Sequence, residues 1–160
     1  MVETSSETKT PTKSARTRKR ILDAAAAEFR QAGYNARLVD IAERAGMQAG
    51  SLYYHFASRE ELVAEILQLG IATAFAQVRQ AVEELDGSDI ESDSRRRLET
   101  AIRAHTMAVL EQSDYASAQA KIVGQVPPDI AKAHKADQRS YGAYWNDLLE
   151  TAANAGVLRA

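Results

Sequence analysis

The stretch LVDIAERAGMQAGSLYYHFASREEL, residues 38–62, predicts two short helices that pivot on one glycine and lead into a third, capped helix. The first short helix would bury a face built at the i, i+3, i+4, i+7 spacing, from Leu38, Ile41, Ala42 and Ala45. Gly46 then ends it, because the sharp turn needs a positive φ that glycine adopts without strain. The second short helix runs from about Ala49 to Phe56 and turns Leu52 and Phe56 toward the core.

Helix, turn, helix is the sequence form of a DNA-binding unit, and the second helix has the side chains that DNA contact requires. Ser51 and Tyr54 can offer hydroxyls to phosphates or base edges, and the ring of Tyr53 can lie against a thymine methyl. His55 can donate to a phosphate oxygen. Small residues at the helix start allow close approach to the groove, namely Ala49 and Gly50. The alternative is that the tyrosines and the histidine are half-buried packing residues; the spacing after a glycine turn favours the DNA role.

The stretch resembles the DNA-binding domain of the TetR family of bacterial transcriptional regulators, most specifically in GSLYYHF at 50–56 and in the Ser, charged residue and Leu that follow. RILDAAAAEFRQAGY at 20–34 is similar to the family's first helix, and LVDIAERAG at 38–46 to its second. The resemblance covers about residues 16–70. It implies an all-α protein, with a three-helix helix-turn-helix DNA-binding head followed by a helical ligand-binding and dimerisation body. It also implies phosphate and base contacts from Ser51, Tyr53, Tyr54, His55 and Arg59.

Two positions depart from the family pattern. Arg37 stands where a threonine usually caps the second helix, and it cannot accept the capping hydrogen bond. The cap then falls to Asn35, or Arg37 replaces it with a charged phosphate contact. Gln48 stands where a capping serine is common; glutamine is a poor cap but can read adenine, so we assign Gln48 to sequence specificity.

Composition bounds the class of protein. The chain has 160 residues, 45% of them hydrophobic, which suffices for one helical unit or for a small head with a modest second module. It has no cysteine, which excludes disulfides and thiolate metal sites. The sequence shows no run of about 18 apolar residues and no signal-peptide core, so we expect a soluble cytoplasmic protein without a membrane partner.

Charge is unevenly placed along the chain. The net charge is −2, but residues 1–60 hold 10 Lys and Arg against 7 Asp and Glu, whereas residues 61–160 hold 10 against 15. The basic part is the part that carries the predicted DNA-binding unit.

The basic residues begin before the first helix. Residues 1–14 predict a disordered basic arm, which either follows phosphates or is a solubilising tail. Residues 15–57 then form the helix-turn-helix domain, whose first helix spans about Ala15 to Ala32 and braces the other two. Arg16 and Arg18, on the approach to this domain, are expected to contact phosphate.

Residues 58–160 predict a helical effector-binding and dimerisation body. Ser58 and Glu61 form a capping box that opens a long helix to about Leu85, which carries two apolar stripes. Further helices are expected near residues 94–112, 114–124 and 128–155. The aromatic residues of the body form either its core or the wall of an effector pocket, whose candidate residues are His105, Tyr115, Tyr141, Tyr144 and Trp145. His105 on an apolar helix face is more often a core histidine than a ligand contact.

The resemblance also implies two further helices that build a four-helix dimer interface, and they do not fit before Ala160. We therefore expect the body to be incomplete: the chain is a truncated form of a longer regulator whose full-length form is a homodimer, or it dimerises differently, or it is a monomer.

The leading hypothesis is a sequence-specific repressor that a small-molecule effector releases from its double-stranded operator. The resemblance of the body suggests an acyl-CoA or another lipid or steroid catabolite as that effector. The alternatives are a protein-interaction module and a non-specific DNA-binding protein without effector control. An enzyme is disfavoured, because the three histidines lie far apart and outside any metal or nucleophile motif. No catalytic residue, metal site or cofactor is predicted.

Overall fold

The computed structural model describes residues 12–85 and 90–158, and these residues are helical, without a strand. The expected all-α fold is confirmed. The elements in chain order are α1 (Lys13–Ala32), the 3-10 turn η1 (Gly33–Asn35), α2 (Leu38–Arg44), α3 (Ala49–Leu52), α4 (Arg59–Glu83), α5 (Ile90–Met107), the π turn η2 (Ala108–Gln112), α6 (Asp114–Ile122) and α7 (Pro128–Asn154).

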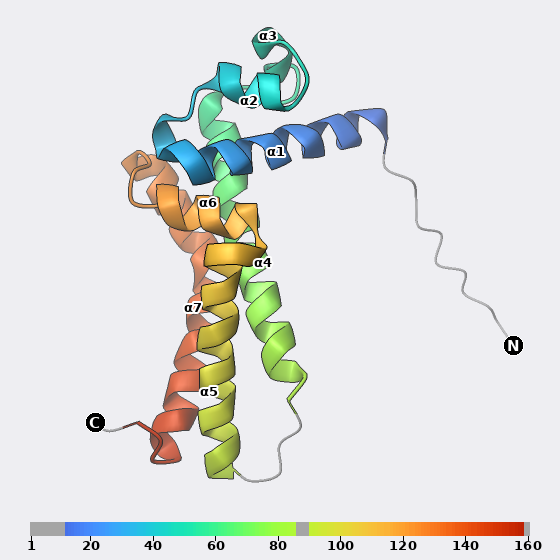
Figure 1. The fold of residues 1–160 in the computed structure, drawn as a ribbon. Helices are drawn as coiled ribbons and strands as arrows, with labels where there is room; N and C mark the ends of the chain where they lie inside the picture. Colours follow the sequence, from blue (N-terminus) through green and yellow to red (C-terminus); the bar gives the residue numbers. More distant parts are fainter. Residues whose placement is uncertain (1–11, 86–89, 159–160) are drawn as a thin grey trace, which may run out of the picture.

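The helices form a head and a body that share α4. Figure 1 shows α1, α2 and α3 gathered at one end, while α4, α5 and α7 run away from them as an elongated bundle and α6 lies between the two parts. Each part has its own hydrophobic core. The head core includes Ile21, Phe29, Ile41, Leu52, Phe56, Leu62 and Ile66. The body core includes Ala74, Val78, Val82, Ala101, Tyr141 and Leu148.

α1 begins earlier than the sequence predicts. Thr12 is its N-cap, since its hydroxyl oxygen accepts a hydrogen bond from the Ala15 N–H at 3.1 Å. Lys13 and Ser14 therefore belong to the helix and not to the arm. The remainder of the predicted arm, including Lys9, lies outside the described residues.

α3 is shorter than expected and ends at Leu52. Beyond it the chain tightens, because the N–H groups of Tyr54 and His55 bond to carbonyls only three residues back. This turn carries Phe56 into the head core, where it is 2% exposed. Leu52 and Phe56 thus take the core positions that the sequence predicts, although Tyr53 and Tyr54 follow the helix and do not lie within it.

The start of α4 has the predicted capping bond with one difference. The Glu61 N–H donates to the Ser58 hydroxyl oxygen at 3.1 Å, as expected. The Glu61 carboxylate, however, accepts from the Ala57 N–H at 2.6 Å, one residue before the cap. The reciprocal bond therefore fixes the chain that enters the helix.

α4 is long and apolar enough to cross a membrane by length and composition, with a mean hydropathy of 1.3 in its most apolar stretch. Its apolar side chains instead supply both cores: Leu62 and Ile66 pack in the head, and Val78 and Val82 pack in the body. The hydropathy of α4 follows from this double burial.

The body differs from the sequence analysis in the face that α5 buries. The sequence predicts a buried face made of Leu98, Ile102, His105 and Val109. The helix begins at Ile90, and Ile102 is 51% exposed. Leu98 is buried as expected, and Ala101 and Ala108, the first residue of η2, are buried with it.

Candidate nucleic-acid interface

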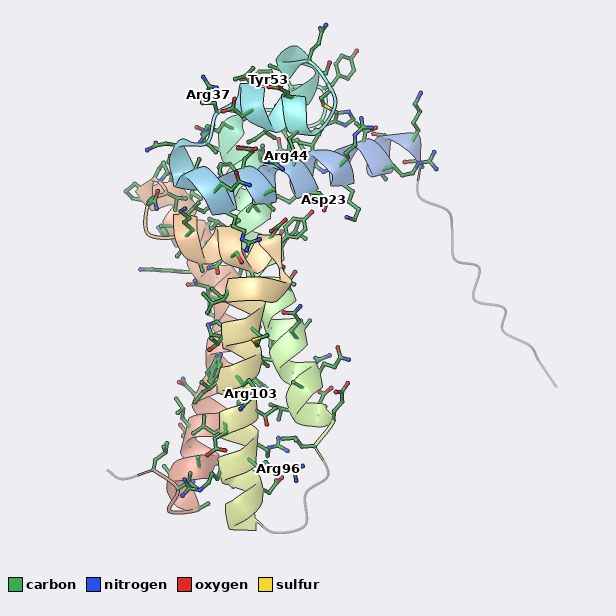
Figure 2. The ribbon with its side chains drawn as sticks, in the orientation of Figure 1. Asp23, Arg37, Arg44, Tyr53, Arg96 and Arg103 are labelled. Atoms are coloured by element: carbon green, nitrogen blue, oxygen red, sulfur yellow. The ribbon has the colours of Figure 1, made fainter. Side chains whose placement is uncertain are left out.

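Two tyrosines stand out on the head, because most other large apolar side chains in it are buried. Tyr54 is 94% exposed and Tyr53 is 58% exposed, and Val39 on α2 is also exposed. Figure 2 shows Tyr53 and Arg37 at the end of the molecule that lies farthest from the body. Clustered exposed aromatic side chains mark a surface that contacts a partner.

The turn that presents this surface depends on one glycine. Gly46 has φ 66°, the left-handed conformation that the sequence predicts for it. Its N–H bonds to the Glu43 carbonyl at 2.9 Å, and the Met47 N–H bonds to the Ala42 carbonyl at the same distance. These bonds close α2 and aim the start of α3 outward.

Neither α2 nor α3 has a side-chain cap at its N-terminus. Arg37 and Gln48 occupy the N-cap positions of α2 and α3, and neither side chain accepts a capping bond. Asn35 does not replace Arg37, because it lies within η1 two residues earlier. Both long side chains are exposed, and the first amides of α3 have no side-chain cap within the described residues.

Arg37 has a carboxylate partner on its own helix. Its guanidinium bonds to Asp40 through Nε at 2.8 Å and through a terminal nitrogen at 2.6 Å. This hydrogen bonding raises the pKa of Arg37 and lowers the pKa of Asp40. A phosphate contact from Arg37 must therefore compete with Asp40 or share the guanidinium with it.

Arg18 and Arg59, both expected to contact phosphate, have partners inside the head. Arg59 donates to the carbonyl of Ala36 at 2.7 Å and to the carbonyl of Tyr34, and its guanidinium lies 5.1 Å from the centre of the Tyr34 ring. Arg18 donates to the His55 carbonyl, pairs with Glu65 and lies 4.0 Å from the centre of the Phe56 ring. Both arginines join the helices of the head, so a phosphate contact from either would have to compete with these partners.

Other cations of α1 are available. Lys13, Arg16 and Arg20 are exposed on its first turns and form no ion pair with any residue that the structure describes. Lys19 pairs with Asp23 at 2.7 Å. The predicted contact Arg16 therefore keeps a free guanidinium on the same head as the exposed tyrosines.

The predicted effector residues divide into two groups. His105, Tyr141, Tyr144 and Trp145 gather with Phe75 in the body: the His105 Nδ1 lies 2.8 Å from the Tyr141 hydroxyl, and the rings of Phe75 and Tyr141 stack at 5.2 Å. Burial lowers the pKa of His105 and raises the pKa of Tyr141. These contacts make the cluster largely a packed core, the first of the two interpretations that the sequence left open.

Tyr115 belongs elsewhere. Its hydroxyl donates to the Asp23 carboxylate of α1 at 2.6 Å, so it joins α6 to the head and does not meet the other aromatic residues. Burial and the bond to Asp23 raise the pKa of Tyr115. The sequence could not reveal this contact, because the two residues are 92 positions apart.

Further polar contacts join α6 and the segment after it to the head. Arg30 of α1 pairs with Asp114 at 2.8 Å, and the Lys121 ammonium donates to the carbonyl of Gln31 at 2.7 Å. The Gln125 side chain accepts from the Tyr34 N–H at 3.2 Å. Any displacement of α6 would therefore pull on α1.

Two clefts border α4 in the body. One, of about 340 Å³, lies against α7 and is lined in part by Phe75 and Tyr141. The other, of about 450 Å³, lies against α5 and includes none of the five predicted effector residues. Sequence reasoning missed this second cleft because its lining mixes small, polar and charged residues that carry no periodic or motif signal.

The chain is similar to proteins of known family along both of its parts. A family model described as "Bacterial regulatory proteins, tetR family" matches residues 21–66, and one described as "Tetracyclin repressor-like, C-terminal domain" matches residues 91–160. The HTH-type transcriptional repressor KstR2 of Mycolicibacterium smegmatis is 30% identical over 159 residues, which cover 94% of this chain and 71% of that protein. The chain belongs to the TetR family.

Other relatives match over part of their length or in fold alone. KstR2 of Mycobacterium tuberculosis is 47% identical over 64 residues, which cover 39% of this chain and 32% of that relative, so the match spans about a third of its length. A solved structure of AibR in complex with isovaleryl coenzyme A and operator DNA superposes with a TM-score of 0.75 at 20% identity, covering 90% of this chain and 76% of that one. This last likeness shows the shared fold.

Proposed function

We propose that the protein is a transcriptional repressor that binds a specific double-stranded operator through α2 and α3 and leaves it when a small-molecule effector binds the body. The observation that carries the proposal is the exposed pair Tyr53 and Tyr54 after a glycine turn, on a head whose other large apolar side chains are mostly buried. Family membership and the repressor relatives support it.

The head residues have distinct roles in this proposal. Gln48, Ser51, Tyr53 and Tyr54 read bases in the major groove, while Ala49 and Gly50 allow the start of α3 to approach it. His55, Arg37 and Arg16 contact phosphates. Arg18 and Arg59 hold these residues in place and do not touch DNA.

A helix-turn-helix head of this kind binds an operator as one of two copies. We propose that the full-length protein is a homodimer whose two heads enter successive major grooves about 34–36 Å apart. It works in the cytoplasm, where a bacterial operator is located. The chain contributes one head per copy, and its body resembles the family's C-terminal domain over residues 91–160.

The effector is proposed to be an acyl-CoA or a related lipid or steroid catabolite. The support is the AibR structure, which contains isovaleryl coenzyme A together with operator DNA. Release would follow from a change in α4 and α6, because α4 carries residues of both cores and α6 bonds to α1 through Tyr115, Asp114 and Lys121. A ligand can shift the head only through its different affinity for the two arrangements.

The test is fluorescence anisotropy with the DNA upstream of the protein's own coding region, compared with scrambled DNA of equal length and titrated over salt. We expect selective binding with two chains per site, and a slope of log affinity against log salt of about −0.9 for each phosphate neutralised. Equal affinity for both DNAs would contradict base reading and would favour the non-specific alternative.

A further inference from the structure

α6 and the first turns of α7 pack together at the head core. Ala118 and Ile122 of α6 and Ile130 of α7 all belong to that core. His134 follows Ile130 by about one helical turn, so it shares a face of α7 with Ile130, and it is likewise buried. A titratable ring therefore lies inside the packing that supports the head.

One polar contact joins α6 to α7 at this ring. The Gln119 amide nitrogen lies 3.3 Å from the His134 Nε2, and both side chains are buried. An amide N–H is a donor, so the ring Nε2 accepts and the ring proton resides on Nδ1. That Nδ1 has no hydrogen-bond partner within the described residues, since the Asp137 carboxylate is 3.9 Å away. The contact is therefore built for a neutral ring.

The position of Gln119 is fixed from the other side by α4. A Cβ atom added at Gly70 would overlap the Cβ of Gln119, so the two helices already touch at this point. α6 in turn bonds to α1, through the Tyr115 hydroxyl and the Asp23 carboxylate at 2.6 Å. A change in how α7 supports Gln119 would therefore reach the head through α6.

Asp137 is the charged group that acts on the ring. Its carboxylate offsets part of the lowering of the His134 pKa that burial causes. α4 carries no charged residue between Glu65 and Arg79, the stretch that includes Gly70. The charged groups of α6 and the last acid of α4 before Gly70 have other partners: Asp114 pairs with Arg30, Lys121 donates to the Gln31 carbonyl and Glu65 pairs with Arg18. A protonated ring would thus be a buried cation without a hydrogen-bonded carboxylate, a state that is costly unless water can reach it.

We propose that the contact between Gln119 and His134, here called the α6–α7 latch, is a proton-sensitive switch on operator binding. It is closed while the ring is neutral and opens when a protonated ring draws in water. The closed form binds fewer protons than the open form, so lowering the pH favours the open form. Opening removes the support of α7 from α6, and α6 then holds α1 less firmly. The effect on the operator rests on the proposed function, to which the latch adds the proton as a regulator.

Operator anisotropy at fixed salt, measured from pH 7.5 to pH 5.5, tests the switch on the parent protein and on His134→Gln. Glutamine can still bond to Gln119 but does not titrate. We expect the parent to lose about fivefold or more in operator affinity relative to the variant as the pH falls. Comparing the two proteins removes the effect of His55 on the DNA-binding surface, which acid makes more cationic in both. Parallel pH curves for parent and variant would overturn the proposal.

His105→Gln is the matched control. Burial lowers the pKa of His105 as it does that of His134, but the His105 ring bonds to Tyr141 of α7 and not to α6. This variant should keep the pH dependence of the parent protein. Circular dichroism at each pH restricts the comparison to folded protein. If His105→Gln flattened the curve as much as His134→Gln, a general loss of body stability would explain the effect and the latch would be refuted.

A second readout, without DNA, separates the latch from the proposed function. In an NMR pH titration of the parent, the amide signals of Gln119 and Tyr115 should follow the titration of the His134 ring, and in His134→Gln this response should be absent. If these signals do not respond, the latch does not open. If they respond while operator affinity does not, the regulatory role is overturned. If the protein binds no operator at all, the proposed function fails, while the NMR titration still decides whether the latch opens.

Discussion

At the scale of single residues, arginines of the head that the sequence assigns to the same role have different partners in the structure. Arg37 projects from an N-cap and pairs only with a neighbour on its own helix, whereas Arg59 donates to two carbonyls more than 20 residues earlier in the chain. A motif places both near DNA. Only the folded chain shows that Arg59 is occupied by Ala36 and Tyr34, because those carbonyls come from a segment that the motif does not specify.

Replacing Arg59 and Arg37 by glutamine should therefore have opposite effects. We expect Arg59→Gln to lower the free energy of unfolding by about 1.5–3 kcal/mol, the range for hydrogen bonds to a charged group. Arg37→Gln should leave stability nearly unchanged and weaken operator binding. Urea unfolding and DNA anisotropy on both variants check this, and a destabilised Arg37→Gln with a fully stable Arg59→Gln would contradict it.

Tyr54 offers the sharper test of base reading. Its side chain is 94% exposed, so Tyr54→Ala should not change the unfolding midpoint but should cost about tenfold or more in operator affinity. The change should leave affinity for scrambled DNA nearly intact. Leu149→Ala, which removes an exposed apolar side chain from α7, serves as the control. An equal loss on both DNAs would mean that Tyr54 contacts backbone and not bases.

At the scale of elements, α4 and α6 approach each other closely at Gly70. A Cβ atom added at Gly70 would overlap the Cβ of Gln119 and lie 2.5 Å from the Tyr115 carbonyl oxygen. Both are atoms near the backbone and cannot move aside as a flexible side-chain end can. Gly70 therefore sets how deeply α6 packs onto α4, and with it the position from which Tyr115 reaches Asp23.

Gly70→Ala should push these helices apart. We expect it to destabilise the protein by about 1–3 kcal/mol through overpacking and to alter operator affinity through α6. Gly142→Ala on α7 is the matched control: nothing lies within 4 Å of its added Cβ, so the same change should stabilise by about 0.5–1 kcal/mol. Thermal unfolding of the two variants measures both effects. Equal shifts in the same direction would show that α4 and α6 are not locked at this contact.

At the scale of the whole molecule, two histidines make body stability depend on pH. Burial lowers the pKa of His105 and of His134. His134 is 3% exposed, and the Asp137 carboxylate 3.9 Å away offsets only part of the lowering of its pKa. The folded protein thus keeps both rings neutral where the unfolded chain protonates them, near pH 6.5. Their contribution to stability is complete above that pH and is lost as pH falls from 6.5 toward the folded pKa values.

We therefore expect the midpoint of urea unfolding to decrease as the pH is lowered from 7 to 5. Carboxylates of ordinary pKa stay charged in this window. His134→Gln should flatten part of this dependence. The His134→Gln variant should be only modestly less stable than the parent protein at pH 7. The new glutamine can still bond to Gln119, which His134 now contacts at 3.3 Å. Identical midpoints for the parent protein at the two pH values would refute the assignment.

The fold was largely predictable from sequence and the site only in part. Periodicity and caps located the helices, the turn at Gly46 and the core roles of Leu52 and Phe56, since these depend on neighbours along the chain. The hydrogen bond from Arg18 to the His55 carbonyl joins residues 37 positions apart, and the bond from Tyr115 to Asp23 joins residues 92 positions apart. The α4–α5 cleft depends on side-chain volumes at a helix contact. Local patterns cannot specify such long-range geometry.

α4 runs unbroken from the head core into the body core, and this continuity has a mechanical consequence. Its 25 residues make a lever about 37 Å long. A tilt of about 5° at the body end would swing the head end by roughly 3 Å, close to the ~3.4 Å step between stacked base pairs. Under the proposed function, a ligand that tilted α4 by a few degrees would displace the head by about one base-pair step relative to its operator.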